Sequence, residues 1–88
     1  MQVLQTNQFR KSYKKLFPNQ LGETNKAISE IIANPDIGEK KRGDLSWLKV
    51  HKFKMTGQLT LIGYTVEKDT LTLIALGPHE NFYRDIKR

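Results

Sequence analysis

The spacing of apolar residues changes its period once, at Gly43, and this change constrains the fold more than any other feature. Before Gly43 apolar side chains recur at helical spacing, and after it they alternate with a period of two. Helices followed by strands that tight turns connect predict an α+β domain, with the helices packed on an antiparallel meander. A chain of 88 residues is enough for one such domain, which we take to span residues 1–88.

Two amphipathic helices are predicted in the first half of the chain. After a short candidate strand at 3–6, Thr6 or Asn7 can cap the first helix through a side-chain oxygen. Pro18 is expected to end that helix, and a second helix is predicted from about Leu21 to Ala33. The apolar stripes, which we expect to be core, are Phe9, Tyr13, Leu16 and Phe17 in the first helix and Leu21, Thr24, Ile28, Ile31 and Ile32 in the second.

Three strands and a short helix are predicted in the second half. A hairpin turn is expected at Gly57-Gln58, with Thr56-Gly57 as the alternative. Gly77-Pro78 should break the last strand, and the residues from Glu80 onward should form a C-terminal helix. The predicted order is therefore β-α-α-β-β-β followed by a helix. The predicted strands are 45–55, 59–66 and 70–76.

Positive charge is concentrated in two segments. The net charge is +6; residues 1–18 carry four basic side chains and no acid, and residues 39–54 carry six basic against two acidic side chains. Such clustering favours a polyanion or an acidic protein as partner over a basic surface kept for solubility. The chain has no cysteine, no apolar run of signal-peptide length and no run of about 20 apolar residues that would cross a membrane. We therefore expect a cytoplasmic protein without disulfides or thiolate chemistry.

Two histidines and a tyrosine make up the candidate site. His51 shares its predicted strand face with Lys49, and His79 lies four residues before Tyr83, just beyond the last strand. At that spacing His79 and Tyr83 lie on one face of a helix. Counting by twos from Leu71 also assigns His79 to one face of the last strand. If the two strand faces coincide, both imidazoles and Lys49 converge on one groove; the alternative is a polar tail after the last strand.

Such a groove suits the cleavage of an RNA phosphodiester by its own 2′-hydroxyl. A base removes the hydroxyl proton, an acid protonates the leaving 5′-oxygen, and cations stabilise the charge on the phosphoryl oxygens. Histidine suits both proton roles because its ordinary pKa is about 6.5, and lysine or arginine supplies the electrostatic stabilisation. The reaction requires no metal or other cofactor, and the sequence offers no obvious carboxylate cluster that would bind a metal.

Two runs of the second half carry a family resemblance: GDLSWLKVH at 43–51 and LGPHENFY at 76–83. With the paired helices before the sheet, they resemble the RelE/ParE superfamily of toxins from bacterial type II toxin–antitoxin systems, and within it the RelE- and YafQ-like branch. The resemblance implies a ribosome-dependent messenger RNA endonuclease that a cognate antitoxin neutralises. Its other implied partners are the ribosome and messenger RNA, and the free toxin is expected to be a monomer.

The resemblance also implies roles for individual residues. His51 matches a strand histidine that transfers protons in YafQ-like members, and His79 matches the histidine or arginine that acts on the leaving group or the phosphate. Tyr83 matches a C-terminal aromatic residue that positions the substrate, and Lys49 is a further catalytic candidate. The candidates for binding RNA or its phosphates are Lys52, Lys54, Lys40, Lys41, Arg42, Arg84 and Phe82.

The chain departs from the RelE-like pattern just after the hairpin glycine, where Gln58 and Leu59 stand in place of an arginine. The additional acidic and histidine side chains of some YafQ-like sites also lack clear counterparts. The first alternative function is therefore that of the ParE branch, which shares the fold, lacks the nuclease residues and poisons DNA gyrase. The second alternative is a non-catalytic basic module that binds nucleic acid.

Overall fold

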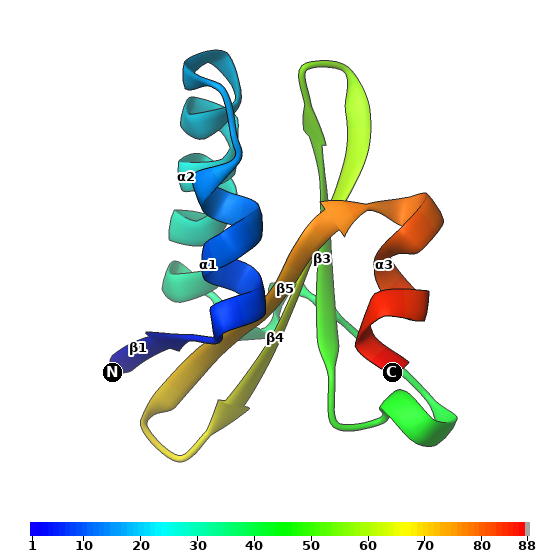
Figure 1. The fold of residues 1–88 in the computed structure, drawn as a ribbon. Coiled ribbons are helices and arrows are strands. Elements are labelled where there is room, and N and C mark those ends of the chain that lie inside the picture. Colours follow the sequence, from blue (N-terminus) through cyan, green and yellow to red (C-terminus); the bar gives the residue numbers. More distant parts are fainter. Residues whose placement is uncertain (88) are drawn as a thin grey trace.

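The computed structural model describes residues 1–87 and contains a five-stranded sheet with helices on both faces (Figure 1). The strands are β1 (Gln2–Gln5), β2 (Glu39–Lys40), β3 (Lys49–Met55), β4 (Gln58–Glu67) and β5 (Thr70–Pro78). The helices are α1 (Asn7–Lys14), α2 (Pro18–Ala33) and α3 (His79–Lys87), with 3₁₀ turns η1 (Pro35–Ile37) and η2 (Gly43–Leu45). The predicted α+β class is confirmed.

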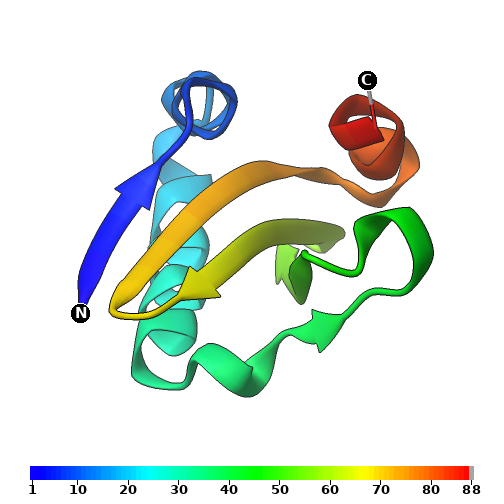
Figure 2. The ribbon, with the colours of Figure 1, turned by 90° about the horizontal axis from the view of Figure 1, so that it is seen from below.

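The sheet is mixed, with the strand order β1-β5-β4-β3-β2. β1 pairs in parallel with β5, whereas the other pairs are antiparallel. β3, β4 and β5 form the predicted meander, although β3 begins at Lys49 and not at residue 45, because residues 43–45 form η2. The sequence does not predict β2, which forms in the basic connection before β3, where Glu39 and Lys40 pair with Val50 and Lys49. β1 and β2 lie at the two edges of the sheet (Figure 2).

Thr6 caps α1 and also connects this helix to the sheet. Its hydroxyl oxygen accepts a hydrogen bond from the Phe9 amide at 3.1 Å, as expected of an N-cap. The same hydroxyl donates to the Ile74 carbonyl of β5 at 2.6 Å. The first helix is therefore fixed at its start to the strand that leads to α3.

α2 begins earlier than the sequence predicts. Pro18 is its first residue instead of Leu21, because the first turn of a helix does not use the backbone N–H that proline lacks. Phe17 precedes α2 and is 68% exposed, and Ile32 is 40% exposed. The predicted core positions of these two residues are wrong; for Phe17 the reason is that α1 ends at Lys14. No helix within residues 1–87 is long and apolar enough to span a membrane.

Each face of the sheet buries its own core. The hairpin core, beneath α1 and α2, consists of Phe9, Ala27, Ile31, Ile62, Tyr64, Leu71, Leu73 and Leu76. The α3 core, beneath α3, consists of Leu45, Leu48, Val50, Leu61, Ala75 and Phe82. A sheet covered on both faces explains why the middle of β4 is continuously buried and shows little alternation.

A bulge in β5 changes which face its residues point to. The pairing with β4 slips by one residue between Leu73 and Ala75, which leaves Ile74 as an extra residue in β5. Leu71 and Leu73 consequently belong to the hairpin core, whereas Ala75 belongs to the α3 core. Counting by twos from Leu71 to His79 is therefore wrong beyond Leu73, because an inserted residue exchanges the two faces.

The ends of β4 and β5 also differ from the first expectation. The β3–β4 turn uses Thr56 and Gly57, the alternative prediction, with positive φ angles of 50° and 81°. Such angles at both central residues suit a two-residue hairpin turn. Gly77-Pro78 does not break β5, which runs to Pro78 and pairs there with Thr60. Because α3 begins at the next residue, the strand passes directly into the helix.

Candidate active site

α3 places His79 and Tyr83 one helical turn apart, as their spacing predicts. The two rings meet edge to face, with centroids 6.0 Å apart and an angle of 82° between their planes. His79 is exposed and Tyr83 is half-buried. An edge-to-face contact at this distance is favourable and orients one ring against the other. The predicted pairing of these side chains on one helix face is confirmed.

Lys41, the residue after β2, approaches the Tyr83 ring. Its Nζ lies 5.3 Å from the ring centroid and 2.6 Å from the Glu39 carboxylate. The Glu39 carboxylate, and next the Tyr83 side chain, raise the pKa of Lys41. Lys41 above all, and then the charge of Lys52, lower the pKa of Glu39. We call His79, Tyr83, Lys41, Glu39 and Lys52 the α3 site.

Phe82 holds α3 against the sheet. Its side chain is 3% exposed and packs in the α3 core. A Cβ at Gly63 would lie 2.9 Å from the ring Cζ of Phe82 and 3.2 Å from Cδ1 of Leu48, so glycine leaves the space that the ring fills. Because the ring is almost fully buried, it offers no face on which an RNA base could stack, and the predicted RNA-binding role of Phe82 stays a prediction. The ring instead positions Tyr83, which it meets edge-on at 5.2 Å.

His51 and Lys49 lie on the hairpin face, away from α3. His51 Nε2 is buried without a hydrogen-bond partner and lies 3.5 Å from Glu30 Oε1 of α2. The His51 ring stacks on Phe53, with centroids 6.4 Å apart. Lys49 Nζ lies 2.8 Å from Asp36 Oδ1 and lowers the pKa of that carboxyl. The predicted convergence of both histidines and Lys49 on one groove is therefore wrong.

Strand geometry explains the separation. Val50 belongs to the α3 core, so Lys49 and His51 beside it in β3 point to the opposite face. By the same alternation Lys52 and Lys54 are assigned to the α3 face, and Lys40, which pairs with Lys49, to the hairpin face. The predicted phosphate-binding side chains that are exposed are Lys40, Arg42, Lys52, Lys54 and Arg84.

The α3 site brings together an imidazole, a phenol and two ammonium groups at the end of the sheet. Such groups can transfer protons and stabilise an anion. The carboxylate of the α3 site, that of Glu39, is engaged by Lys41. Among the side chains that the structure describes, which exclude those of residues 81, 85, 87 and 88, no three His, Asp or Glu residues are grouped closely enough to hold a metal ion.

Residues 3–87 match the family model of the ParE-like toxins of type II bacterial toxin–antitoxin systems. The chain belongs to this family. The match confirms the resemblance to the RelE/ParE superfamily. No curated protein matches the chain.

Solved structures of RelE proteins share the fold of this family member. A chain of the intact Escherichia coli RelBE toxin–antitoxin complex is 18% identical, with a TM-score of 0.71 over 90% of this chain and 96% of that chain. The isolated E. coli RelE toxin is 20% identical, with a TM-score of 0.68 over 99% and 96%. A mutant of E. coli RelE in the free state is 17% identical, with a TM-score of 0.70 over 90% and 83%. At these identities the likeness concerns the fold alone.

Two features of this ParE-like toxin were not predicted from its sequence. Glu39, which engages Lys41 beside Tyr83, belongs to the unpredicted β2; its spacing of two from Lys41 is the signal that places both on one side of an extended segment. The second feature is a groove between α1 and α3 that Lys11 and Lys15 line. The sequence feature that could have predicted this groove is the basic segment without acids at residues 1–18. The interpretation of α1 relied instead on its apolar stripe.

Proposed function

We propose that this toxin is a ribosome-dependent endonuclease that cleaves messenger RNA and thereby inhibits translation. The observation that carries the proposal is the α3 site, where Tyr83 contacts both His79 and Lys41. A second lysine, Lys52, acts with Lys41 to lower the pKa of Glu39. The shared fold of the RelE toxins supports the proposal. The reaction class is attack of the RNA 2′-hydroxyl on the adjacent phosphate.

The side chains of the α3 site supply the proton transfers and charges that this reaction needs. The 2′-oxygen bonds to phosphorus while the bond from phosphorus to the 5′-oxygen breaks. His79 removes the 2′-hydroxyl proton, since histidine exchanges protons near neutral pH. The Tyr83 hydroxyl supplies a proton to the leaving 5′-oxygen, and Lys41 and Lys52 stabilise the phosphoryl oxygens. The products are a 2′,3′-cyclic phosphate and a 5′-hydroxyl.

Exposed cations around the α3 site extend the proposed RNA surface. Lys54 lies on the same strand as Lys52, and Arg84 follows Tyr83 on α3. Lys40 and Arg42 flank Lys41, and we assign their contacts to ribosomal RNA. Lysine and arginine at such positions bind phosphates without reading the sequence.

A cognate antitoxin is the proposed neutralising partner. One of the similar structures is that of the intact E. coli RelBE toxin–antitoxin complex, which supports this proposal. An acidic, partly disordered antitoxin segment would complement the positive charge of this toxin, which is +6 overall. We propose that the free toxin is a monomer and that it acts in the cytoplasm, where messenger RNA is translated.

Poisoning of DNA gyrase is the second candidate function. The matching family model is that of ParE-like toxins. In addition, the α3 site contains one histidine where the sequence suggested two, because His51 faces α2. A gyrase poison would keep its toxicity when His79 is replaced, whereas the proposed nuclease would lose it.

The deciding experiment is primer extension on a messenger RNA in a purified translation system, with and without ribosomes. The wild type is compared with His79→Ala and Tyr83→Phe, and with His51→Gln as a control histidine on the opposite face. We expect cuts that require ribosomes and that fall by about 10²–10⁴-fold in His79→Ala, the usual contribution of an acid–base group. Tyr83→Phe should reduce cleavage, and His51→Gln should leave it close to wild type.

Two results would count against the nuclease. An intact message at toxin concentrations that stop growth would exclude cleavage and direct attention to a gyrase supercoiling assay. Cleavage that survives His79→Ala but disappears in His51→Gln, with both variants folded, would move the chemistry to the hairpin face and overturn the assignment of the α3 site.

A further inference from the structure

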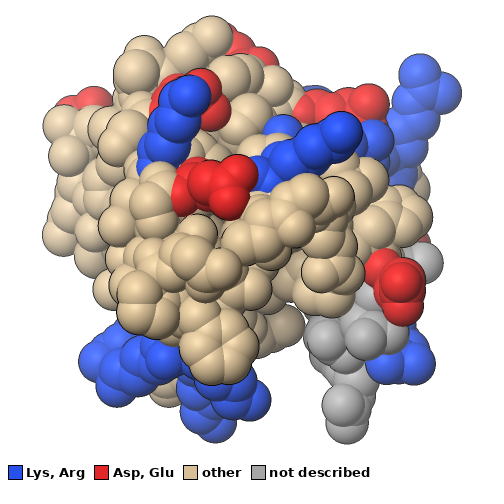
Figure 3. Space-filling view, turned by 90° about the horizontal axis from the view of Figure 1, so that it is seen from above, with Lys and Arg blue, Asp and Glu red and all other residues tan. Residues whose placement is uncertain are grey.

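The outer face of α1 carries cations without acidic partners. Arg10, Lys11, Lys14 and Lys15 are exposed. Among the side chains that the structure describes, ion pairs join Lys41 to Glu39, Lys49 to Asp36 and His51 to Glu30, and no cation of α1 is paired with an acid. In the space-filling view the blue side chains over α1, at the lower left, have no red side chain beside them (Figure 3).

The helix itself does not account for this arrangement. Lys11 and Lys14 lie in the last turn of α1, where a cation interacts favourably with the helix dipole. However, Arg10 and Lys14 form a like-charge pair four residues apart, and so do Lys11 and Lys15. Like-charge pairs at this spacing destabilise a helix. The stability of α1 therefore does not by itself explain why these cations gather on it.

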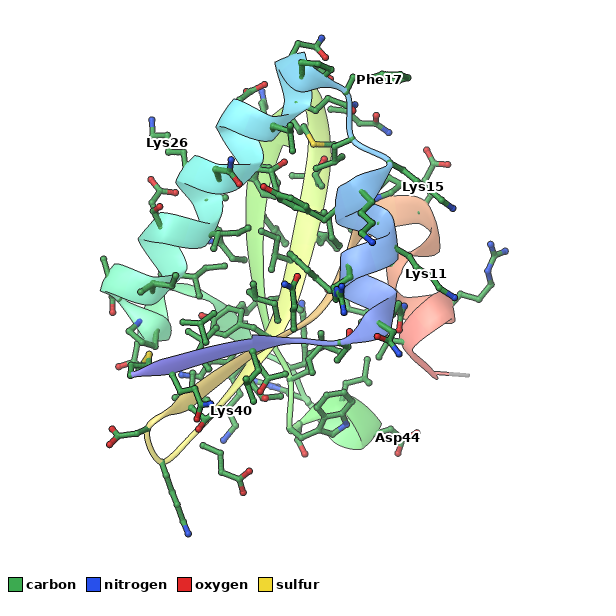
Figure 4. The ribbon with its side chains drawn as sticks, turned by 60° about the vertical axis from the view of Figure 1, so that its left-hand side comes forward. Lys11, Lys15, Phe17, Lys26, Lys40 and Asp44 are labelled. Atoms are coloured by element: carbon green, nitrogen blue, oxygen red, sulfur yellow. The ribbon has the colours of Figure 1, made fainter. Side chains whose placement is uncertain are left out.

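A groove of about 290 Å³ gives two of these cations a defined place. Gln8, Lys11, Ser12 and Lys15 form one wall, and the end of β5 with Phe82 of α3 forms the remainder. The wall residues are spaced at three or four, so they share one face of α1. Lys11 and Lys15 lie on the same side of α1, the side nearer α3, and Lys26 lies far from them on α2 (Figure 4).

We propose that this groove binds the phosphate backbone of single-stranded RNA. Among the side chains that the structure describes, the polar groups that line it are two ammonium groups, an amide and a hydroxyl, and none is a carboxylate. Of its apolar residues, Ala75, Leu76 and Phe82 offer little surface to a protein partner, because they are 3%, 7% and 3% exposed, whereas Pro78 is exposed. Protein interfaces depend on buried apolar and aromatic anchors, whereas backbone phosphates need donors and positive charge. The groove has the second set of properties.

The groove continues the α3 site, and the inference rests on the nuclease function proposed above. Pro78 lines the groove and is followed directly by His79. Phe82 lines the groove while its neighbour Tyr83 belongs to the α3 site. An RNA strand with its scissile phosphate at His79 therefore passes into the groove within a few nucleotides, and Lys11 and Lys15 bind phosphates beside the cleaved one.

Binding of a fluorescein-labelled 2′-O-methyl RNA oligonucleotide, measured by anisotropy, tests the groove separately from cleavage, since this RNA has no free 2′-hydroxyl. The variant is Lys11→Gln/Lys15→Gln. The matched control is Arg10→Gln/Lys14→Gln, which removes two charges at the same spacing from the same helix but outside the groove. Circular dichroism confirms that both variants are folded.

We expect Lys11→Gln/Lys15→Gln to raise the Kd for RNA by roughly tenfold and to reduce the slope of log K against log salt by about 1.4, two contacts at about 0.7 each. The control should leave the slope close to that of the wild type. Equal affinities of the two folded double variants would overturn the proposal. So would an unchanged RNA affinity together with weaker binding of a labelled oligoglutamate peptide, which would assign the groove to an acidic protein segment. This assay measures binding and not cleavage. The groove proposal can therefore fail or hold whether or not His79 proves to be catalytic.

Discussion

The two faces of the sheet carry the same residue types and use them differently. On the hairpin face, His51 lies against Glu30 and Lys49 is paired with Asp36. On the α3 face, His79 is exposed beside Tyr83. The comparison teaches that a histidine near a lysine does not identify a site by itself. What distinguishes the two faces is the surroundings of the histidine, because His51 lies against a carboxylate of α2 whereas His79 is exposed and contacts a tyrosine ring.

The largest expected effects come from the two cores. Ile31→Ala in the hairpin core should lower the free energy of unfolding by about 2–5 kcal/mol, and Phe82→Ala in the α3 core by about 3–5 kcal/mol, since both side chains are buried. Only Phe82→Ala should also abolish RNA cleavage by the folded protein, because it releases the helix that carries His79 and Tyr83. Urea unfolding and cleavage assays under conditions where each variant is folded would measure both quantities.

One result would contradict the conclusion that the chemistry lies on the α3 face and not on the hairpin face. If Ile31→Ala reduced cleavage by the folded protein as strongly as Phe82→Ala, the hairpin face would be as close to the chemistry as α3 is. A thermal melt of each variant provides the necessary control, because loss of activity through unfolding then appears as a loss of folded fraction.

Two glycines, one on each side of the molecule, give effects of opposite sign. Gly63→Ala should destabilise the protein by about 1–3 kcal/mol, because the new Cβ meets Phe82 at 2.9 Å and Leu48 at 3.2 Å. Gly22→Ala should stabilise it by about 0.5–1 kcal/mol, because Gly22 is an exposed residue of α2 with nothing within 4 Å of its Cβ position. Urea unfolding curves of both variants measure the difference.

A double variant sharpens this second prediction. Phe82→Leu shortens the side chain that the Gly63 Cβ would meet, so Gly63→Ala/Phe82→Leu should cost less than the sum of the two single changes. Additive costs would mean that the contact between Gly63 and Phe82 does not limit how closely α3 approaches the sheet.

Much of the fold could be predicted from the sequence because local signals specify it. The stripe of α1, its cap at Thr6 and the alternating strands after Gly43 all depend on residues close in sequence. The faces could not be predicted. The extra residue Ile74 exchanges the two sides of β5, and no pattern in the sequence marks it. Without the bulge, counting places His79 on the face of Leu71 and Leu73, where His51 lies.

In the candidate site, too, the contacts between residues close in sequence could be predicted and those that depend on strand pairing could not. The contact between His79 and Tyr83 follows from helical spacing and could be predicted. The approach of Lys41 to Tyr83 could not, because it depends on how β2, an edge strand of two residues, pairs with β3. The burial of Phe82 likewise depends on Gly63, which lies 19 positions earlier in the sequence.

The smallest expected effect concerns two exposed acids, one on each face. Lys49 holds the pKa of Asp36 below its ordinary 3.8, and Lys41 holds that of Glu39 below its ordinary 4.5. A carboxyl whose pKa is lowered in the folded state adds stability above its ordinary pKa and loses that contribution as the pH falls through the folded value. Wild-type stability should therefore be constant from pH 7 to about 5 in this respect and decline below it. Asp36→Asn and Glu39→Gln should each remove part of the decline.

Asp36→Asn and Glu39→Gln each remove one negative charge. A difference between their RNA affinities therefore reports which face of the sheet binds RNA. Glu39→Gln removes the strongest influence that raises the pKa of Lys41 and frees that ammonium group for phosphate, so it should tighten binding of the 2′-O-methyl RNA. Asp36→Asn frees Lys49 on the hairpin face and should tighten it less. Urea titrations from pH 3 to 7 and anisotropy at pH 7 would measure both effects. An equal gain in RNA affinity from the two variants would show that RNA responds to net charge alone, and the distinction between the faces would then rest on the cleavage assay with His79 and His51.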